Sequence, residues 1–335
     1  MIKIGISRCR INNFLDLKTL YTLWLNSAEE QKSVAGKSKR FERQAIKMWI
    51  LLTLASAFSL ATSDALTKRV LNRENELMVA WLRLLFSLPL LILIFPFIDL
   101  PETDWQFWSA FLSALPLEIL ALILYVKALR LSPMSLTLPF LSLTPLFLII
   151  TSRLLIGERV SMQGAAGILL IVTGSYTLNI SSIKNGLLEP VRAIFRERGS
   201  VYMILVSFIY SITSTLGKIG VQHSSPVFFG TTYFMAVTLA LTPFVYLKLK
   251  GGITERLKRD WKLVILPGLF FGLMILTHMF AIEVAKVSYM ISLKRTSLLI
   301  GSLYGFLFFG EKRVLERLLG AVLMFSGLVL IVNAG

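Results

Sequence analysis

The sequence predicts an all-α integral membrane protein of about ten transmembrane helices, built as two inverted five-helix repeats. Apolar residues make up 55% of the 335 residues, and the mean hydropathy is +0.72. The apolar residues come in long runs: 160–183 holds 24 residues without a charge, and 227–247 holds 21. Because a helix needs about 20 apolar residues to cross the hydrocarbon core, both runs can span a bilayer.

Ten such segments follow one another from Met48 onward, with no long soluble domain between them. Several tryptophans, among them Trp49, Trp81 and Trp261, fall near segment ends, where amphipathic rings settle at the headgroup level. The lipid bilayer is therefore the expected surrounding. The expected spans are 48–67, 77–98, 105–129, 134–156, 160–180, 201–220, 227–247, 262–283, 287–309 and 314–333.

Residues 1–47 are expected to form a basic N-terminal extension. They carry ten Lys or Arg residues, and their one apolar patch, 14–25, is too short and too polar to span. The extension is either an interfacial amphipathic helix or non-native sequence ahead of a start at Met48. The domains expected after it are a first five-helix repeat over 48–180 and a second over 201–334.

An internal repeat supports this division. A shift of 153 residues places Gly157-Glu158-Arg159 on Gly310-Glu311-Lys312, and near the start an offset of 150 places Leu66-Thr67-Lys68 on Leu216-Gly217-Lys218. Because each copy holds an odd number of spans, the second copy enters the membrane from the opposite side. Inverted repeats are characteristic of secondary transporters, whose similar halves exchange conformations around a midplane site.

The net charge of +16 has two interpretations. A nucleic-acid-binding protein would carry a basic face on a soluble fold, and no such fold is visible. Lys and Arg at span ends explain the excess better, so no nucleic-acid partner is expected. One cysteine, Cys9, and two histidines, His223 and His278, leave little for a metal site. No Gly-x-x-x-x-Gly-Lys-Ser/Thr motif occurs, so neither ATP nor another cofactor is predicted.

Short motifs resemble those of a known family. Pro145 stands twelve residues before Gly157-Glu158-Arg159, similar to the proline followed by Gly-Glu-Arg in the EamA-type drug/metabolite transporter superfamily. The stretch 125–130 looks like the end of that family's third helix. The resemblance covers about 48–334, although Leu298 stands where the second copy would carry its proline.

The resemblance implies a carrier in the cytoplasmic membrane that works by alternating access, with helices three, four, eight and nine lining a central cavity. Family substrates range from amino acids and sugar phosphates to lipophilic cations, so the fold indicates the mode of action better than the substrate. We expect a transporter, not an enzyme, that exports an amino acid or similar small molecule, with protons as the candidate coupling ion. The alternatives are a multidrug exporter of lipophilic cations and, with less support, a membrane-embedded enzyme or a lipid-handling protein.

The orientation in the membrane stays open at this stage. Lys and Arg concentrate in loops after odd-numbered spans, such as 181–200 and 248–261, which by the positive-inside rule places these loops in the cytoplasm and both termini outside. The resemblance implies cytoplasmic termini instead, and the basic residues of 1–47 favour the same side.

Glu118 is the clearest candidate for the transport pathway. A charge at the bilayer centre costs roughly 2.5–3.5 kcal/mol on insertion scales, so each one within a span requires a reason. Glu118 lies in the middle of the third span, and Tyr125, seven residues on, shares its helix face. A carboxyl group there suits a proton or cation site. The alternative is a glutamate that pairs with a neighbouring Lys or Arg for assembly only.

Lys294 and Arg295 lie about two turns into the ninth span. Arg would hold a carboxylate or phosphate bidentately, whereas Lys would act as a point charge. The alternative is that both side chains snorkel to the interface. The sharpest hypothesis places the transport site between helices three and nine, with Glu118 facing Lys294 or Arg295.

Three further candidates have local explanations as well. His278 takes the repeat position of Tyr125 and is either a pathway residue or a hydrogen-bonded packing residue. Asp64 and Lys68, four residues apart at the end of the first span, form either a gate or a local ion pair.

Other residues are expected to shape the helices and their ends. Pro139 and Pro145 interrupt the backbone hydrogen bonds of the fourth span, which is tolerated best beside a cavity or another helix. Glycines in the fifth and tenth spans allow close helix approach, within the chain by default or in a homodimer. Glu158 and Glu311 are expected to tie loops to helix ends, and Arg83 to snorkel.

Overall fold

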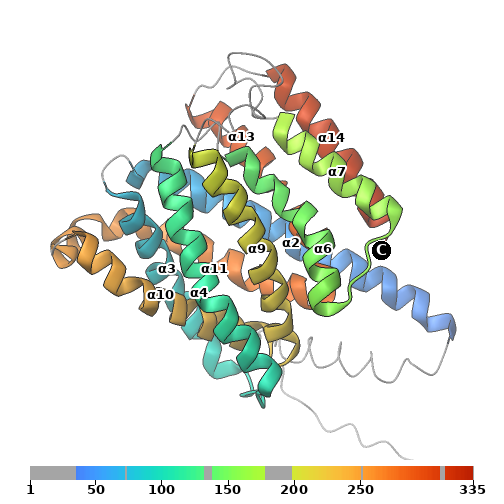
Figure 1. Cartoon of the computed structure of the whole chain (residues 1–335), viewed down its shortest axis with the longest axis horizontal. Helices are drawn as coiled ribbons and strands as arrows, with labels where there is room; N and C mark the ends of the chain where they lie inside the picture. The colour runs from blue at the N-terminus through green and yellow to red at the C-terminus, as the bar shows by residue number, and fades with distance from the viewer. Residues whose placement is uncertain are drawn as a thin grey trace, which may run out of the picture. The chain divides into compact units, whose positions relative to one another are not determined.

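The computed structural model describes residues 35–71, 74–131, 138–177, 198–249, 252–309 and 314–334, which are almost entirely helical (Figure 1). No strand occurs among the described residues. The chain divides into two compact units, Met1–Arg43 and Gln44–Gly335. The patch 14–25 lies outside the described residues, and the interpretation of residues 1–47 stays a prediction.

Helices of the first copy begin and end where capping residues allow. The Asn75 side chain accepts a hydrogen bond from the Leu77 N–H (3.0 Å) at the start of one helix, and Asp104 accepts from the Phe107 N–H (2.9 Å) at the start of the next. Gly157, with φ of 71°, ends another helix in the left-handed conformation that glycine tolerates best. The elements are α2 (Ala35–Leu71), α3 (Glu76–Ile94), η2 (Phe95–Phe97), α4 (Trp105–Leu131), η3 (Leu138–Leu143), α6 (Thr144–Ile156) and α7 (Met162–Thr177).

The second copy repeats this order with the same spacing. Helix α13 begins at Ser297 and ends at Phe309, each 153 residues after the corresponding end of α6. The elements are α9 (Arg198–Gln222), α10 (Pro226–Leu249), α11 (Ile253–Val284), α12 (Val287–Lys294), α13 (Ser297–Phe309) and α14 (Val314–Val332).

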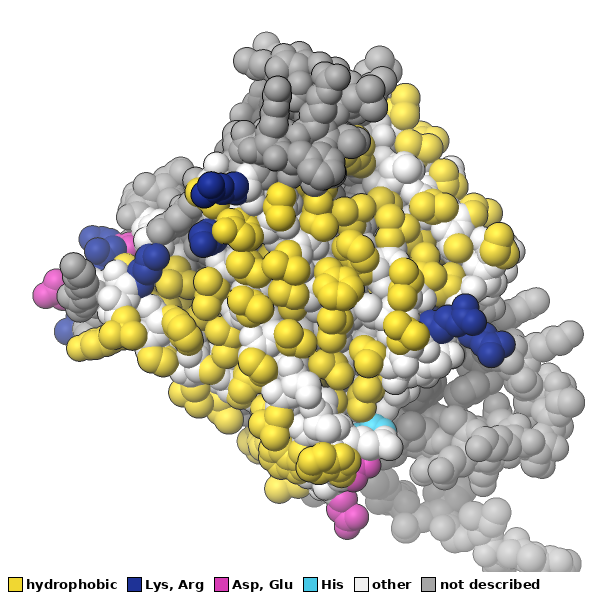
Figure 2. All heavy atoms as spheres, in the orientation of Figure 1, with side chains coloured by type: hydrophobic (Ala, Val, Ile, Leu, Met, Phe, Trp, Pro, Cys, Tyr) yellow, Lys and Arg dark blue, Asp and Glu magenta, His cyan; other side chains and the backbone are white. Residues whose placement is uncertain are grey.

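Six segments among the described residues are long and apolar enough to cross a membrane: Lys47–Thr67, Leu77–Phe97, Trp105–Tyr125, Arg198–Gln222, Pro226–Leu249 and Trp261–Val284. Phe140–Ile156 and Leu319–Val332 are shorter apolar helices. Figure 2 shows hydrophobic side chains over most of the visible face, with the charged ones near its margins. This surface is typical of a protein surrounded by lipid, while the count of ten spans stays a prediction.

The expected span 134–156 is observed from Leu138 onward as η3 followed directly by α6, and the expected span 287–309 is observed as α12 followed by α13. Pro145 lies in the first turn of α6, where its missing N–H costs nothing. In the second copy the division occurs at Arg295 without any proline. There the Thr296 hydroxyl donates to the Leu293 carbonyl (2.8 Å), and the backbone N–H of Thr296 donates to the same carbonyl (3.0 Å). Hydrogen bonds between residues three apart are typical of a 3-10 turn, which is tighter than an α-helical turn and ends the helix.

Helices of the first copy pack against helices of the second copy, and buried side chains fill the space between them. Helix α4 packs against α9, α3 against α10 and α11, and α6 against α9 and α12 (Figure 1). Large side chains such as Phe107, Met78, Phe229 and Tyr289 are fully buried in this core.

Helices α7 and α14 pack closely through glycines of both copies. A Cβ atom on Gly167 would lie 2.7 Å from the Gly327 carbonyl oxygen, and one on Gly174 would lie 2.7 Å from that of Gly320. The earlier glycine of α7 meets the later one of α14, so the two helices run antiparallel. Equivalent helices that run in opposite directions are what an inverted repeat requires, and here the glycines serve packing within the chain.

The Gly174→Ala variant is expected to destabilise the fold by about 1–3 kcal/mol, because the new methyl group meets backbone that cannot move aside cheaply. Gly301→Ala is the matched control: a Cβ there meets no described atom within 4 Å, and alanine in a helix gains about 0.5–1 kcal/mol over glycine. Thermal melting of the purified protein in detergent measures both. Equal melting temperatures for the two variants would contradict the close packing.

Candidate functional site

Five ionisable side chains from both copies gather between the helices, and we call them the central cluster: Asp64 of α2, Arg83 of α3, Glu118 of α4, and Lys294 and Arg295 at the α12–α13 division. Lys294 interacts electrostatically with Glu118, Asp64 and Arg295. The structure therefore brings together residues that are more than 200 positions apart in the sequence.

Glu118 lies on the face of α4 that packs against α9. Its carboxylate lies close to the Thr213 side chain of α9 and interacts electrostatically with Lys294. Tyr210 of α9 and Tyr233 of α10 lie within electrostatic range of Glu118, and the buried Tyr233 hydroxyl has no hydrogen-bond partner among the described residues. The Glu118 carboxylate therefore has two phenols, from α9 and α10, within electrostatic range.

Lys294 is held by two groups of α11. Its ammonium nitrogen lies 3.1 Å from the Met274 sulfur and 3.1 Å from Nδ1 of His278. Because an ammonium group only donates, Nδ1 of His278 accepts this hydrogen bond, and the ring proton sits on Nε2. His278 therefore positions Lys294.

Arg295 lies where the chain turns from α12 into α13. It interacts electrostatically with Tyr125 and Tyr210, and its buried Nε has no hydrogen-bond partner among the described residues. A buried guanidinium donor with no partner is costly, and it suits an anionic group that enters the site.

Asp64 and Arg83 form an ion pair that the sequence did not predict. The guanidinium of Arg83, on α3, also lies 4.3 Å from the centre of the Phe271 ring. Whether Arg83 also reaches the membrane interface stays a prediction. The side chain of Lys68 lies outside the described residues, so its pairing with Asp64 stays a prediction.

Neither proline lies inside a continuous helix. Pro139 falls in η3, and its side chain lies outside the described residues. Pro145 is buried in the first turn of α6 and so starts a helix instead of kinking one.

Glu158 ties the two copies together at a helix end, as the sequence suggested. Its Oε1 accepts a hydrogen bond from Lys218 Nζ (2.6 Å), and its Oε2 accepts one from the Val287 N–H (2.9 Å) at the start of α12. Lys218 also donates to the Ala285 carbonyl (2.6 Å). Glu311, the repeat counterpart of Glu158, lies outside the described residues.

Two other carboxylates of the first copy pair with basic side chains of the second. Asp104 lies 2.8 Å from Nδ1 of His223, and the Phe107 N–H is the main cause that holds the pKa of Asp104 below its usual range. The buried Glu74 pairs with Arg256 (2.6 Å) and with Arg259.

Sequence reasoning missed several members of the site, namely Arg83, Thr213, Tyr210, Tyr233 and Met274. The sequence could have singled out Arg83 as a site residue, since a charge one turn inside a span requires a partner. The others are ordinary residues of apolar spans and gave none. No group of three or more His, Cys, Asp or Glu that could hold a metal occurs among the described residues.

Comparison with known proteins agrees with this architecture. The model of the EamA-like transporter family matches residues 47–180 and again 197–333. A solved crystal structure superposes on 84% of this chain and 95% of its own length, with a TM-score of 0.67 and 16% sequence identity, and so shares the fold. No curated protein matches the chain in sequence. With two matched repeats that cover most of its length, the chain belongs to the EamA-like transporter family and is a membrane transporter of small molecules.

Proposed function

We propose that the chain is a secondary carrier that exports a small metabolite, an amino acid or a similar compound, across the cytoplasmic membrane by alternating access. Protons are coupled to export at Glu118. The observation that carries this proposal is the central cluster, since its charges come from both copies and meet where two inverted halves can rock about a shared site.

The charges of the cluster favour a substrate that carries an anionic group. Three cations, Arg83, Lys294 and Arg295, face two carboxylates, Asp64 and Glu118. Arg83 is already paired with Asp64, which leaves Arg295 to receive a carboxylate or phosphate. Glu118 then binds either a proton or the amino group of the substrate.

A second candidate is export of lipophilic cations. Tyr233, which lies within electrostatic range of Glu118, belongs to an aromatic group: it stacks on Phe229 with ring centres 5.1 Å apart, and Phe111 packs edge-on against it at 5.5 Å. Aromatic faces and a carboxylate attract cations. Lys294 and Arg295 repel them, which makes the metabolite the first choice.

The Arg295→Ala variant is expected to raise the substrate concentration for half-maximal transport about tenfold or more, with a smaller effect on the maximal rate. Losing a charge-assisted hydrogen bond costs about 1.5–3 kcal/mol, and about 1.4 kcal/mol is a factor of ten. Exchange of labelled amino acids and other small metabolites, measured in proteoliposomes, is the test. Lys258→Ala, which removes an exposed cation from α11, is the control.

Two outcomes would overturn the proposal. If amino acids and related anions are not exchanged while lipophilic cations are, the second candidate is correct. If neither class moves, but the reconstituted protein converts a lipid or a metabolite chemically, the chain does not act as a carrier of these compounds.

A further inference from the structure

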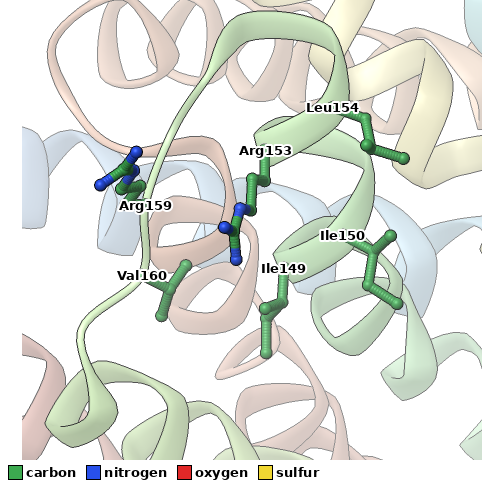
Figure 3. Close-up of a pocket in the computed structure, with 6 residues that line it drawn as sticks. All are labelled: Ile149, Ile150, Arg153, Leu154, Arg159 and Val160. Carbon is green, nitrogen blue, oxygen red and sulfur yellow. The ribbon is translucent and has the colours of Figure 1, made fainter.

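A furrow of about 570 Å³ runs along the outer side of α6, near the end of that helix. Its walls are the last two turns of α6 and the connecting segment after Gly157 (Figure 3). Figure 3 shows Arg153 reaching from α6 into the space between the helix and the segment that carries Arg159 and Val160. The furrow is lined by Ile149, Ile150, Arg153, Leu154, Arg159 and Val160.

Neither arginine has a partner among the described residues: Arg153 and Arg159 form no ion pair and no side-chain hydrogen bond there. Arg83 and Lys218, by contrast, are both paired with carboxylates. Two guanidinium groups without a described partner therefore line one furrow, and both attract an anion.

The rest of the furrow is apolar and faces outward. Ile150 is 61% exposed and Leu154 is 77% exposed. Met162, at the start of α7, is 89% exposed close by. Since this is the end of an apolar helix in a membrane transporter, these side chains contact lipid, while the arginines of its last turn reach the headgroup level.

We infer that the furrow is a binding site for an anionic phospholipid of the surrounding bilayer. The headgroup phosphate bridges Arg153 and Arg159, since guanidinium groups match phosphate oxygens bidentately. The start of one acyl chain lies along Ile149, Ile150 and Leu154. Phosphatidylcholine carries a choline cation that both arginines repel, so the site favours lipids with net negative charge.

The site also lies next to the tie between the two copies. Arg159 follows Glu158, whose carboxylate holds Lys218 and the first turn of α12. A lipid bound at Arg159 therefore contacts the segment between α6 and α7 next to Glu158, the residue through which this segment contacts the second copy.

The full-length protein in detergent is titrated with short-chain phosphatidylglycerol, and bound lipid is counted by native mass spectrometry. The double variant Arg153→Gln/Arg159→Gln is expected to bind this lipid at least tenfold more weakly. The control, Lys258→Gln/Lys262→Gln, removes the same charge from the exposed start of α11 and is expected to stay within twofold of the unchanged protein. Arg153→Lys/Arg159→Lys keeps the charge but loses bidentate geometry, so an intermediate affinity is expected.

Two further arms identify the ligand. Short-chain phosphatidylcholine is expected to bind at least tenfold more weakly than phosphatidylglycerol, and inorganic phosphate is expected to compete only at far higher concentration. Equal binding of both lipids, equal losses in the two glutamine double variants, or competition by phosphate at the lipid's own concentration would each overturn the inference. Should the first double variant fail to fold, the lysine pair and the single variants carry the same comparison.

Discussion

Replacing Glu118 with glutamine is expected to abolish coupled transport while the protein still folds and inserts. Glutamine has nearly the same shape and keeps an oxygen that can accept a hydrogen bond from Thr213, but it removes the negative charge that faces Lys294. A glutamine can neither take up nor release a proton, so the pH dependence of transport should disappear with it. Substrate exchange and proton movement, followed together in proteoliposomes, are the measurements.

Glu102→Gln is the control for this prediction, since Glu102 is exposed in the connection before α4. It is expected to transport at the unchanged rate. If Glu118→Gln transports normally and keeps its pH dependence, Glu118 serves only as a partner of Lys294 and Thr213, and the coupling site must lie elsewhere.

Replacing Lys218 with methionine is expected to cause the largest loss of stability among the variants considered. The side chains of Lys218 and Glu158 are only 8% and 12% exposed, and their ion pair links the first copy to the second. Removing one partner of a buried pair costs about 3–5 kcal/mol, because the other charge is left without compensation. Unfolding in detergent, followed by helix content, measures the loss.

A double-mutant cycle isolates the pair. Glu158→Gln keeps an oxygen that can accept the Val287 N–H, so combining it with Lys218→Met should cost clearly less than the sum of the two single changes. Lys262→Met, at an exposed position, should change stability by less than about 0.5 kcal/mol. Additive losses would show that Lys218 and Glu158 do not depend on each other.

The partners in these ion pairs could not be read from the sequence. Glu158 was expected to tie a loop to a helix end, and it does so, but its partners Lys218 and Val287 lie 60 and 129 positions away. Helical periodicity tells which residues share a face of one helix. It carries no information about which helix that face meets, so the pairing of Arg83 with Asp64 could not be predicted.

The sequence left open whether the ninth span is broken. The absence of a proline at Leu298 removed the usual sequence signal for a break, yet α12 ends at Lys294. Backbone hydrogen bonds between residues three apart, as in a 3-10 helix, occur at 295–299 and divide the helix without a proline. Lys294 and Arg295 lie at this break, and both belong to the central cluster.

By itself the sequence determined that this is a helical membrane protein with an internal repeat and a resemblance to EamA-type transporters. Hydropathy, motif spacing and the offset between the two repeats are properties of the chain alone. It also singled out Glu118, Lys294 and Arg295, since charges within spans are conspicuous wherever they occur. Only the tertiary structure decided that Arg83 pairs with Asp64 and that His278 holds Lys294. These contacts join segments whose proximity results from packing between helices, and packing is a property of the whole fold rather than of any segment.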